Sequence, residues 1–127
     1  MTDFFISLGQ YGDLGLLLLR LCIAAIFLVH GPKKLSGAMG GFMTFIGICE
    51  TACALAILAG FLTQLAVLGI AIIMIGATWK KINEWHIPFT TMQNTGWEFD
   101  LLILGTCLAL LFLGAGAYSV DAMYWGM

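Results

Sequence analysis

Arg20 and Glu50 stand out chemically in this sequence, because each lies inside a long apolar run. A lone charge at the centre of a membrane span costs roughly 3 kcal/mol, so such a residue is usually paired or functional. Arg20 lies ten residues before His30, and Glu50 lies nine residues after Gly41. At about 1.5 Å per helical residue these separations are about 15 Å and about 13.5 Å. The spacing therefore predicts that both charges lie near the membrane midplane at matching depth and form a salt bridge.

Two interpretations of this pair remain open, and they are compatible. The pair could only fix the register and packing of two helices, or it could form a polar pocket that binds a head group or relays a proton. In the second case Arg20 and Glu50 form the floor, and His30, Trp97 and Glu98 line the mouth. An apolar pocket with a few converging polar groups suits a quinone. Trp97 is equally typical of the interfacial aromatic belt, and His30 of a residue that caps helix carbonyls.

The pattern assigns no catalytic residue. Arg20, His30 and Glu50 are the candidates, and Trp97 and Glu98 complete the predicted ligand-binding set.

The four cysteines all fall in apolar stretches and predict no metal site, because none forms a Cys-x-x-Cys motif: Cys22, Cys49, Cys53 and Cys107. Cys49 and Cys53 are four residues apart, on one side of a helix. They can be small buried hydrophobic residues or a thiol pair for sulfur chemistry. A bis-histidine haem would need His30 and His86, and His86 lies in a loop with no further ligand set to support it.

The composition excludes a soluble fold. Of the 127 residues, 61% are hydrophobic and only 9% are charged, which is too few charges to cover a soluble surface. The five Lys and Arg residues and the net charge of −2 also leave no electrostatic footprint for nucleic acid. The chain is therefore predicted to be an integral membrane protein with the lipid bilayer as its main partner.

The apolar runs predict an all-α membrane protein, a single domain over residues 1–127, with four transmembrane helices in an antiparallel up-down bundle. We expect spans at residues 14–30, 41–60, 64–80 and 99–118. Gly31-Pro32 should end the first span, because a residue before proline avoids the helical region. The uncharged run 51–79 is split at Gly60, because a single helix from Gly41 would be about 57 Å long.

The lysines predict the orientation. Lys33 and Lys34 lie in the first loop, and Lys80 and Lys81 lie in the third, whereas the termini and the second loop have none. By the positive-inside rule the lysine-bearing loops should be cytoplasmic and both termini outside.

Four segments together make the chain resemble the DoxX family of small four-helix bacterial and archaeal membrane proteins. Residues 19–35 (LRLCIAAIFLVHGPKKL) look like the family's first helix, and residues 47–50 (GICE) like its second-helix glutamate. Residues 94–99 (NTGWEF) are similar to the start of its last helix. Residues 114–121 (GAGAYSVD) resemble its closing segment, with Ala115 in place of a proline and Ala117 in place of a basic residue.

The resemblance implies a role next to quinone chemistry, in the cytoplasmic (inner) membrane. The named family member is a subunit of a terminal quinol oxidase and of a thiosulfate:quinone oxidoreductase, so a bound quinone is expected as the only cofactor. Arg20, His30, Glu50 and Glu98 are the positions to which the resemblance points. Electrons would come from a partner subunit, because no flavin, haem or iron-sulfur motif is evident. The alternatives are a non-catalytic anchor or assembly subunit for a redox enzyme and a small transporter that forms homo-oligomers.

Overall fold

Every regular element in the computed structural model, which describes residues 1–37, 40–93 and 96–125, is a helix. The elements are α1 (Thr2–Leu8), the 3-10 helix η1 (Gly9–Tyr11), α2 (Gly12–Lys33), α3 (Gly41–Ala59), α4 (Thr63–Asn83), α5 (Trp97–Leu113) and α6 (Val120–Trp125).

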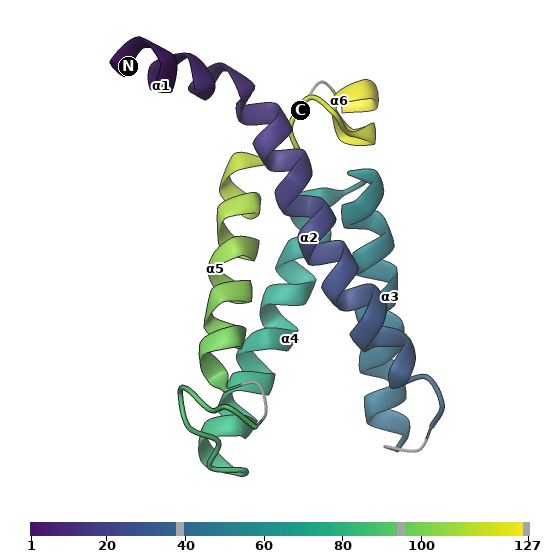
Figure 1. Ribbon diagram of the computed structural model, residues 1–127. Coiled ribbons are helices and arrows are strands. Elements are labelled where there is room, and N and C mark those ends of the chain that lie inside the picture. Colours follow the sequence, from purple (N-terminus) through teal and green to yellow (C-terminus); the bar gives the residue numbers. More distant parts are fainter. Residues whose placement is uncertain (38–39, 94–95, 126–127) are drawn as a thin grey trace.

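The four long helices α2–α5 form an antiparallel bundle of two hairpins (Figure 1). α2 packs most extensively against α3, and α4 against α5, while the α3–α4 contact joins the two hairpins. Both chain termini lie at one end, which we call the terminal end. The loops that follow α2 and α4 lie at the other, lysine-bearing end, toward which the hairpins diverge in Figure 1. The predicted fold class is therefore confirmed.

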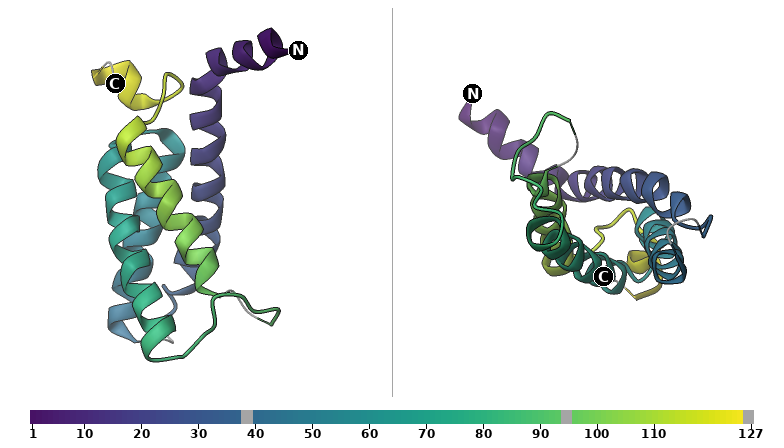
Figure 2. Two further views of the ribbon diagram at one scale, coloured as in Figure 1. Left: turned by 90° about the vertical axis from the view of Figure 1, so that its left-hand side faces the viewer. Right: turned by 90° about the horizontal axis from the view of Figure 1, so that it is seen from below.

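Three helical stretches are long and apolar enough to cross a membrane: Thr2–Lys33, Gly41–Ala59 and Thr63–Asn83. The fourth, α5, has 17 residues and packs beside α4. At about 1.5 Å per residue it is about 25 Å long, slightly less than the hydrocarbon thickness of about 30 Å. The short helix α1 buries none of its residues and projects away from the bundle (Figure 2).

The bundle has one apolar core, built from one buried stripe on each helix. Buried residues recur every three or four positions, as expected for one face of an α-helix. The stripes are Ile23, Ala24 and Phe27 on α2, Ala54 and Ile57 on α3, Ala66, Val67, Ile70, Ala71 and Met74 on α4, and Ile103, Cys107 and Leu110 on α5. Polar residues continue these stripes at both ends of the core, which places charged side chains inside the bundle.

The prediction that the first span ends before Pro32 is wrong, because α2 continues through Pro32 to Lys33. Proline disfavours a helical residue before it mainly through a clash with that residue's Cβ and N–H. The residue here is Gly31, which has no Cβ. Pro32 also lies in the last turn, so the helix loses one hydrogen bond near its end instead of in its middle.

Two glycines with positive φ angles mark the C-terminal ends of α3 and α5. Gly60 has φ of 74° and ends α3 at the predicted turn, where the N–H of Phe61 bonds to Ala56 O at 2.9 Å. Gly114 has φ of 81° and ends α5 at Leu113. The predicted span to residue 118 is therefore too long, and the chain after Gly114 folds back across the terminal end as α6 (Figure 2, left).

Candidate functional site

A lysine closes the interior of the first hairpin at the lysine-bearing end. Lys34 directly follows α2, and its Nζ lies 2.8 Å and 3.0 Å from the two carboxylate oxygens of Glu50 on α3. The Glu50 side chain is 3% exposed and that of Lys34 is 22% exposed. A pair with one partner this deep is screened much less by salt than a surface pair.

The second hairpin repeats this arrangement. Lys81 near the end of α4 lies 3.0 Å from Asp100 Oδ1 in the first turn of α5. Asp100 is 2% exposed, and Lys81 is 15% exposed. The Thr78 hydroxyl approaches Asp100 Oδ2 at 3.5 Å from the turn of α4 above Lys81.

The two pairs together form what we call the charged layer: Lys34, Glu50, Lys81 and Asp100. Because the helices follow one another around the bundle, positive and negative groups alternate from α2 to α5. Glu50 and Asp100 continue the buried stripes of α3 and α5, so the layer lies directly against the apolar core.

His30 lies at the same end, between the hairpins. Its ring centroid is 6.4 Å from that of Phe99 on α5, although His30 itself is exposed. His30 and Lys34 are four residues apart, which places both on one side of α2. The structure thus brings His30 and the Lys34–Glu50 pair to the same part of the bundle.

Trp97 and Glu98 also lie at the lysine-bearing end, but on its outer side. The half-buried Trp97 packs edge-on against Phe89 with ring centroids 4.5 Å apart. The exposed Glu98 accepts a hydrogen bond from the Thr90 hydroxyl at 2.8 Å. The N-terminal part of the 94–99 motif, Asn94 and Thr95, lies outside the described residues. His86 is exposed in the loop between α4 and α5.

Arg20 lies at the opposite, terminal end of the core. It is completely buried, and its guanidinium donates to Ile57 O at 3.2 Å and to Tyr118 O. Asp121 contributes an opposite charge nearby and accepts hydrogen bonds from the N–H groups of Leu62 and Thr63 at 2.7 Å and 2.9 Å. The carboxylate thereby satisfies two free N–H groups at the start of α4, as an anion at a helix N-terminus does.

The predicted Arg20–Glu50 salt bridge is therefore wrong. It assumed that His30 and Gly41 lie at the same level, whereas Gly31 packs against Gly47 and Thr51. Gly31 and Gly47 lack side chains and let α2 and α3 approach closely in this register. Arg20 consequently lies beside Gly60, and the eleven residues from Arg20 to Gly31 span about 16 Å of helix.

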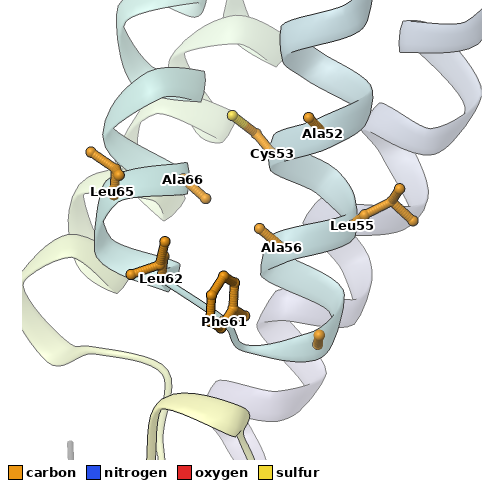
Figure 3. Close-up of a pocket in the computed structure, with 9 residues that line it drawn as sticks. Ala52, Cys53, Leu55, Ala56, Phe61, Leu62, Leu65 and Ala66 are labelled. Atoms are coloured by element: carbon orange, nitrogen blue, oxygen red, sulfur yellow. The ribbon is translucent and has the colours of Figure 1, made fainter. Parts of the chain in front are cut away.

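A groove between α3 and α4 has none of these charged side chains in its lining (Figure 3). Its volume is about 610 Å³, and its lining is almost wholly apolar: Ala52, Cys53, Leu55, Ala56, Ala59, Phe61, Leu62, Leu65 and Ala66. Apart from the Cys53 thiol, these side chains cannot hydrogen-bond a head group.

The cysteines are all free thiols, and only Cys107 is fully buried. In the described parts of the chain, no group of three or more His, Cys, Asp or Glu side chains is arranged to hold a metal ion.

Four functional groups were not singled out from the sequence: Lys34, Lys81, Asp100 and Asp121. The lysines were used only to predict the membrane orientation. The aspartates lie near predicted span ends, where charges are common. One signal was available, since Lys34 and Lys81 are each the second lysine of a Lys-Lys doublet, and the next helix after each doublet carries a carboxylate, Glu50 in the middle of α3 and Asp100 in the first turn of α5.

The DoxX family matches residues 15–81, which comprise most of α2 and α4 and all of α3. This match includes Arg20, His30 and Glu50 and covers more than half of the 127 residues. No curated protein and no solved structure matches the chain. Because its family match spans three of the four bundle helices, the chain belongs to the DoxX family.

Proposed function

We propose that this protein is the membrane subunit of a quinone-linked redox system and that it binds a quinone head group at the lysine-bearing end. The observation that carries the proposal is the position of His30 beside Phe99, one helical turn from the Lys34–Glu50 pair and adjacent to an apolar core. A quinone combines a flat polar ring with a lipid tail, and so needs polar groups next to hydrocarbon.

Each residue of this site has a separate role in the proposal. The His30 imidazole donates a hydrogen bond to a carbonyl oxygen of the ring. Lys34 and Glu50 hold a neutral ion pair beside it, and the partly exposed Lys34 links that pair to water. Phe99 packs against the ring, and Trp97 and Glu98 flank the outer side. Arg20 has no contact with the head group and instead holds the C-terminal segment.

Electron transfer needs a second protein in this proposal, which docks on the lysine-bearing loops. We place these loops in the cytoplasm because they carry four lysines.

The proposal is tested by mass spectrometry of the gently solubilised protein. We expect quinone to co-purify with the wild type and to be lost from His30→Ala and Glu50→Gln. Asp3→Asn is the matched control, because Asp3 is exposed on α1 and far along the chain from the site. Absence of quinone from the wild type, or equal retention by all variants, would contradict the proposal.

A non-catalytic anchor is the second candidate function, and the satisfied ion pairs favour it. Lys34 occupies both oxygens of Glu50, and Arg20 is bonded to two carbonyls, so both groups are explained by packing alone. A stoichiometric redox partner that co-purifies without any quinone on this chain would support the anchor.

A further inference from the structure

Large apolar side chains are exposed along α1 and η1, at the terminal end of the bundle. Neither element buries any of its residues, so these side chains take no part in the core. They are Phe4, Phe5, Ile6, Leu8 and Tyr11. A contiguous apolar surface of this kind usually marks a contact with a membrane or a partner. The surface that covers them therefore lies outside the bundle.

The segment Thr2–Tyr11 is not needed to cross the membrane. Thr2–Lys33 is one apolar helical stretch of 32 residues, which would be about 48 Å long if it were straight. α2 supplies 22 of these residues, and its length of about 33 Å already matches a hydrocarbon thickness of about 30 Å. The segment that precedes α2 therefore begins at the level of the membrane surface.

The chain changes direction at this level. Tyr11, between η1 and α2, has φ of −97° and ψ of 27°, which differ from the values of an α-helix. α1 consequently does not continue along the axis of α2, and it runs sideways from the bundle in both views (Figures 1 and 2). A helix that leaves a membrane span in this direction lies along the membrane surface instead of standing upright in water.

Polar and apolar side chains occupy different sides of α1. Residues four apart share one side of a helix, whereas neighbours in the sequence lie about 100° apart around it. Asp3 and Ser7 therefore share a polar side, and Phe4 and Leu8 share an apolar side. Ile6 departs from this pattern, because it lies closer to Asp3 than to Phe4 around the helix. The separation of the two pairs is typical of a helix that lies at an interface.

The charge of the segment indicates which kind of surface it contacts. Thr2–Tyr11 contains one charged residue, Asp3, and no Lys or Arg. Attraction to anionic head groups therefore contributes nothing, and binding must come from the apolar side chains. The bilayer around α2 offers an apolar surface at the right place, because α1 leads through η1 directly into that span.

We propose that α1 is an in-plane membrane anchor at the terminal end. The side with Phe4 and Leu8 enters the boundary between head groups and acyl chains, and the side with Asp3 and Ser7 faces water. Such a helix holds the start of α2 at a fixed depth in the bilayer. This role is independent of the quinone site at the other end of the bundle.

The test is cysteine labelling of the full chain in phosphatidylcholine nanodiscs that hold one copy each. A water-soluble maleimide is added to four single variants: Asp3→Cys, Ser7→Cys, Phe4→Cys and Leu8→Cys. None of these side chains is buried, so the replacements leave the core unchanged. We expect the two polar-side variants to react at least about tenfold faster than the two apolar-side variants.

Two controls fix the scale of this measurement. The wild type gives the background from its four native cysteines. Labelling in sodium dodecyl sulfate, which unfolds the chain, should be equally fast for all four variants and shows that the engineered thiols themselves do not differ.

Three outcomes would overturn the proposal. Equally fast labelling of all four variants would mean that α1 stands in water. A rate that falls from residue 3 to residue 8 regardless of the side would mean that α1 continues the span upright. Protection of Phe4→Cys and Leu8→Cys only in discs that hold two copies would identify a second copy of the chain, and not lipid, as the cover.

Discussion

Lys34 donates to both carboxylate oxygens of Glu50, at 2.8 Å and 3.0 Å, and so neutralises the one acidic residue of α3. The donor comes from the residue directly after α2, so the contact joins the end of one helix to the interior of the next. Two consequences follow for stability: the carboxylate depends on a single lysine, and that lysine cannot be exchanged for its neighbour Lys33.

Removing only one member of this pair should destabilise the protein more than removing both. Lys34→Met leaves Glu50 charged and buried, which we expect to lower the free energy of unfolding by about 3 kcal/mol. The double variant Lys34→Met/Glu50→Met leaves no unpaired charge and should regain most of that loss. Denaturant unfolding in detergent micelles, followed by circular dichroism, measures all three proteins.

Lys33→Met is the control for this experiment, because it removes the same charge from an exposed neighbour that makes no ion pair within the described chain. If Lys33→Met and Lys34→Met have equal effects, the Lys34–Glu50 pair has no special energetic role.

Arg20→Gln should release the C-terminal segment from the bundle. The variant loses the donors to Ile57 O and Tyr118 O and the charge opposite Asp121, a loss of about 2–3 kcal/mol for charge-assisted bonds. We expect faster limited proteolysis after Gly114, with the cleavage site identified by mass spectrometry. Lys80→Met removes one positive charge at the other end and should not alter the cleavage rate. Equal protection of Arg20→Gln and the wild type would show that the segment is held by other contacts.

Gly60→Ala should be strongly destabilising, and Gly76→Ala should not. At Gly60 the φ of 74° is unfavourable for alanine, and a Cβ would overlap the Arg20 guanidinium and Ser119. At Gly76, inside α4, nothing lies within 4 Å of a Cβ, so alanine should add about 1 kcal/mol of helix propensity. Thermal unfolding of the two variants in micelles measures the difference. Similar midpoints would mean that the turn after α3 adapts to a side chain.

Reporter fusions should place the C-terminus outside the cytoplasm. The four lysines lie at the end of the bundle opposite the termini, so the positive-inside rule orients the whole molecule. Alkaline phosphatase fused after the last residue should be active, and green fluorescent protein fused there should not fluoresce. The same two reporters in the loop between α4 and α5 should give the opposite pattern. Fluorescence of the C-terminal fusion would reverse the proposed orientation.

The sequence was sufficient to predict the four long helices, because local signals set them, whereas α1 and α6 were not predicted. Apolar runs of membrane length identify α2–α5, and Gly60 marks the α3–α4 turn. The helix ends were less predictable where two effects compete, as at Gly31-Pro32, where the missing Cβ of glycine removes the usual restriction by proline. At Gly114 the apolar run continues, but the backbone leaves the helix.

The partners of the buried charges could not be predicted, because they depend on the register between helices. If His30 and Gly41 lay at the same level, Arg20 would lie beside Glu50. Instead, the contact of Gly31 with Gly47 shifts α3 along α2. Because of that shift Glu50 pairs with Lys34. Arg20 instead bonds to residues that are distant in the sequence. Such contacts follow from tertiary packing, which no local pattern records.

The bond from Arg20 to Tyr118 also constrains the order of assembly in the membrane. The two residues are 98 positions apart, so α2 is synthesised and inserted long before this second partner of its buried arginine exists, and only Ile57 O on α3 is made earlier. Until then the arginine lacks both Tyr118 O and the opposite charge of Asp121, and the cost of such a charge in the bilayer, roughly 3 kcal/mol on insertion scales, opposes stable insertion of the helix. Closure of the bundle therefore waits for the last part of the chain to be made, and a ribosome-bound chain that ends before Tyr118 should still be open at its terminal end.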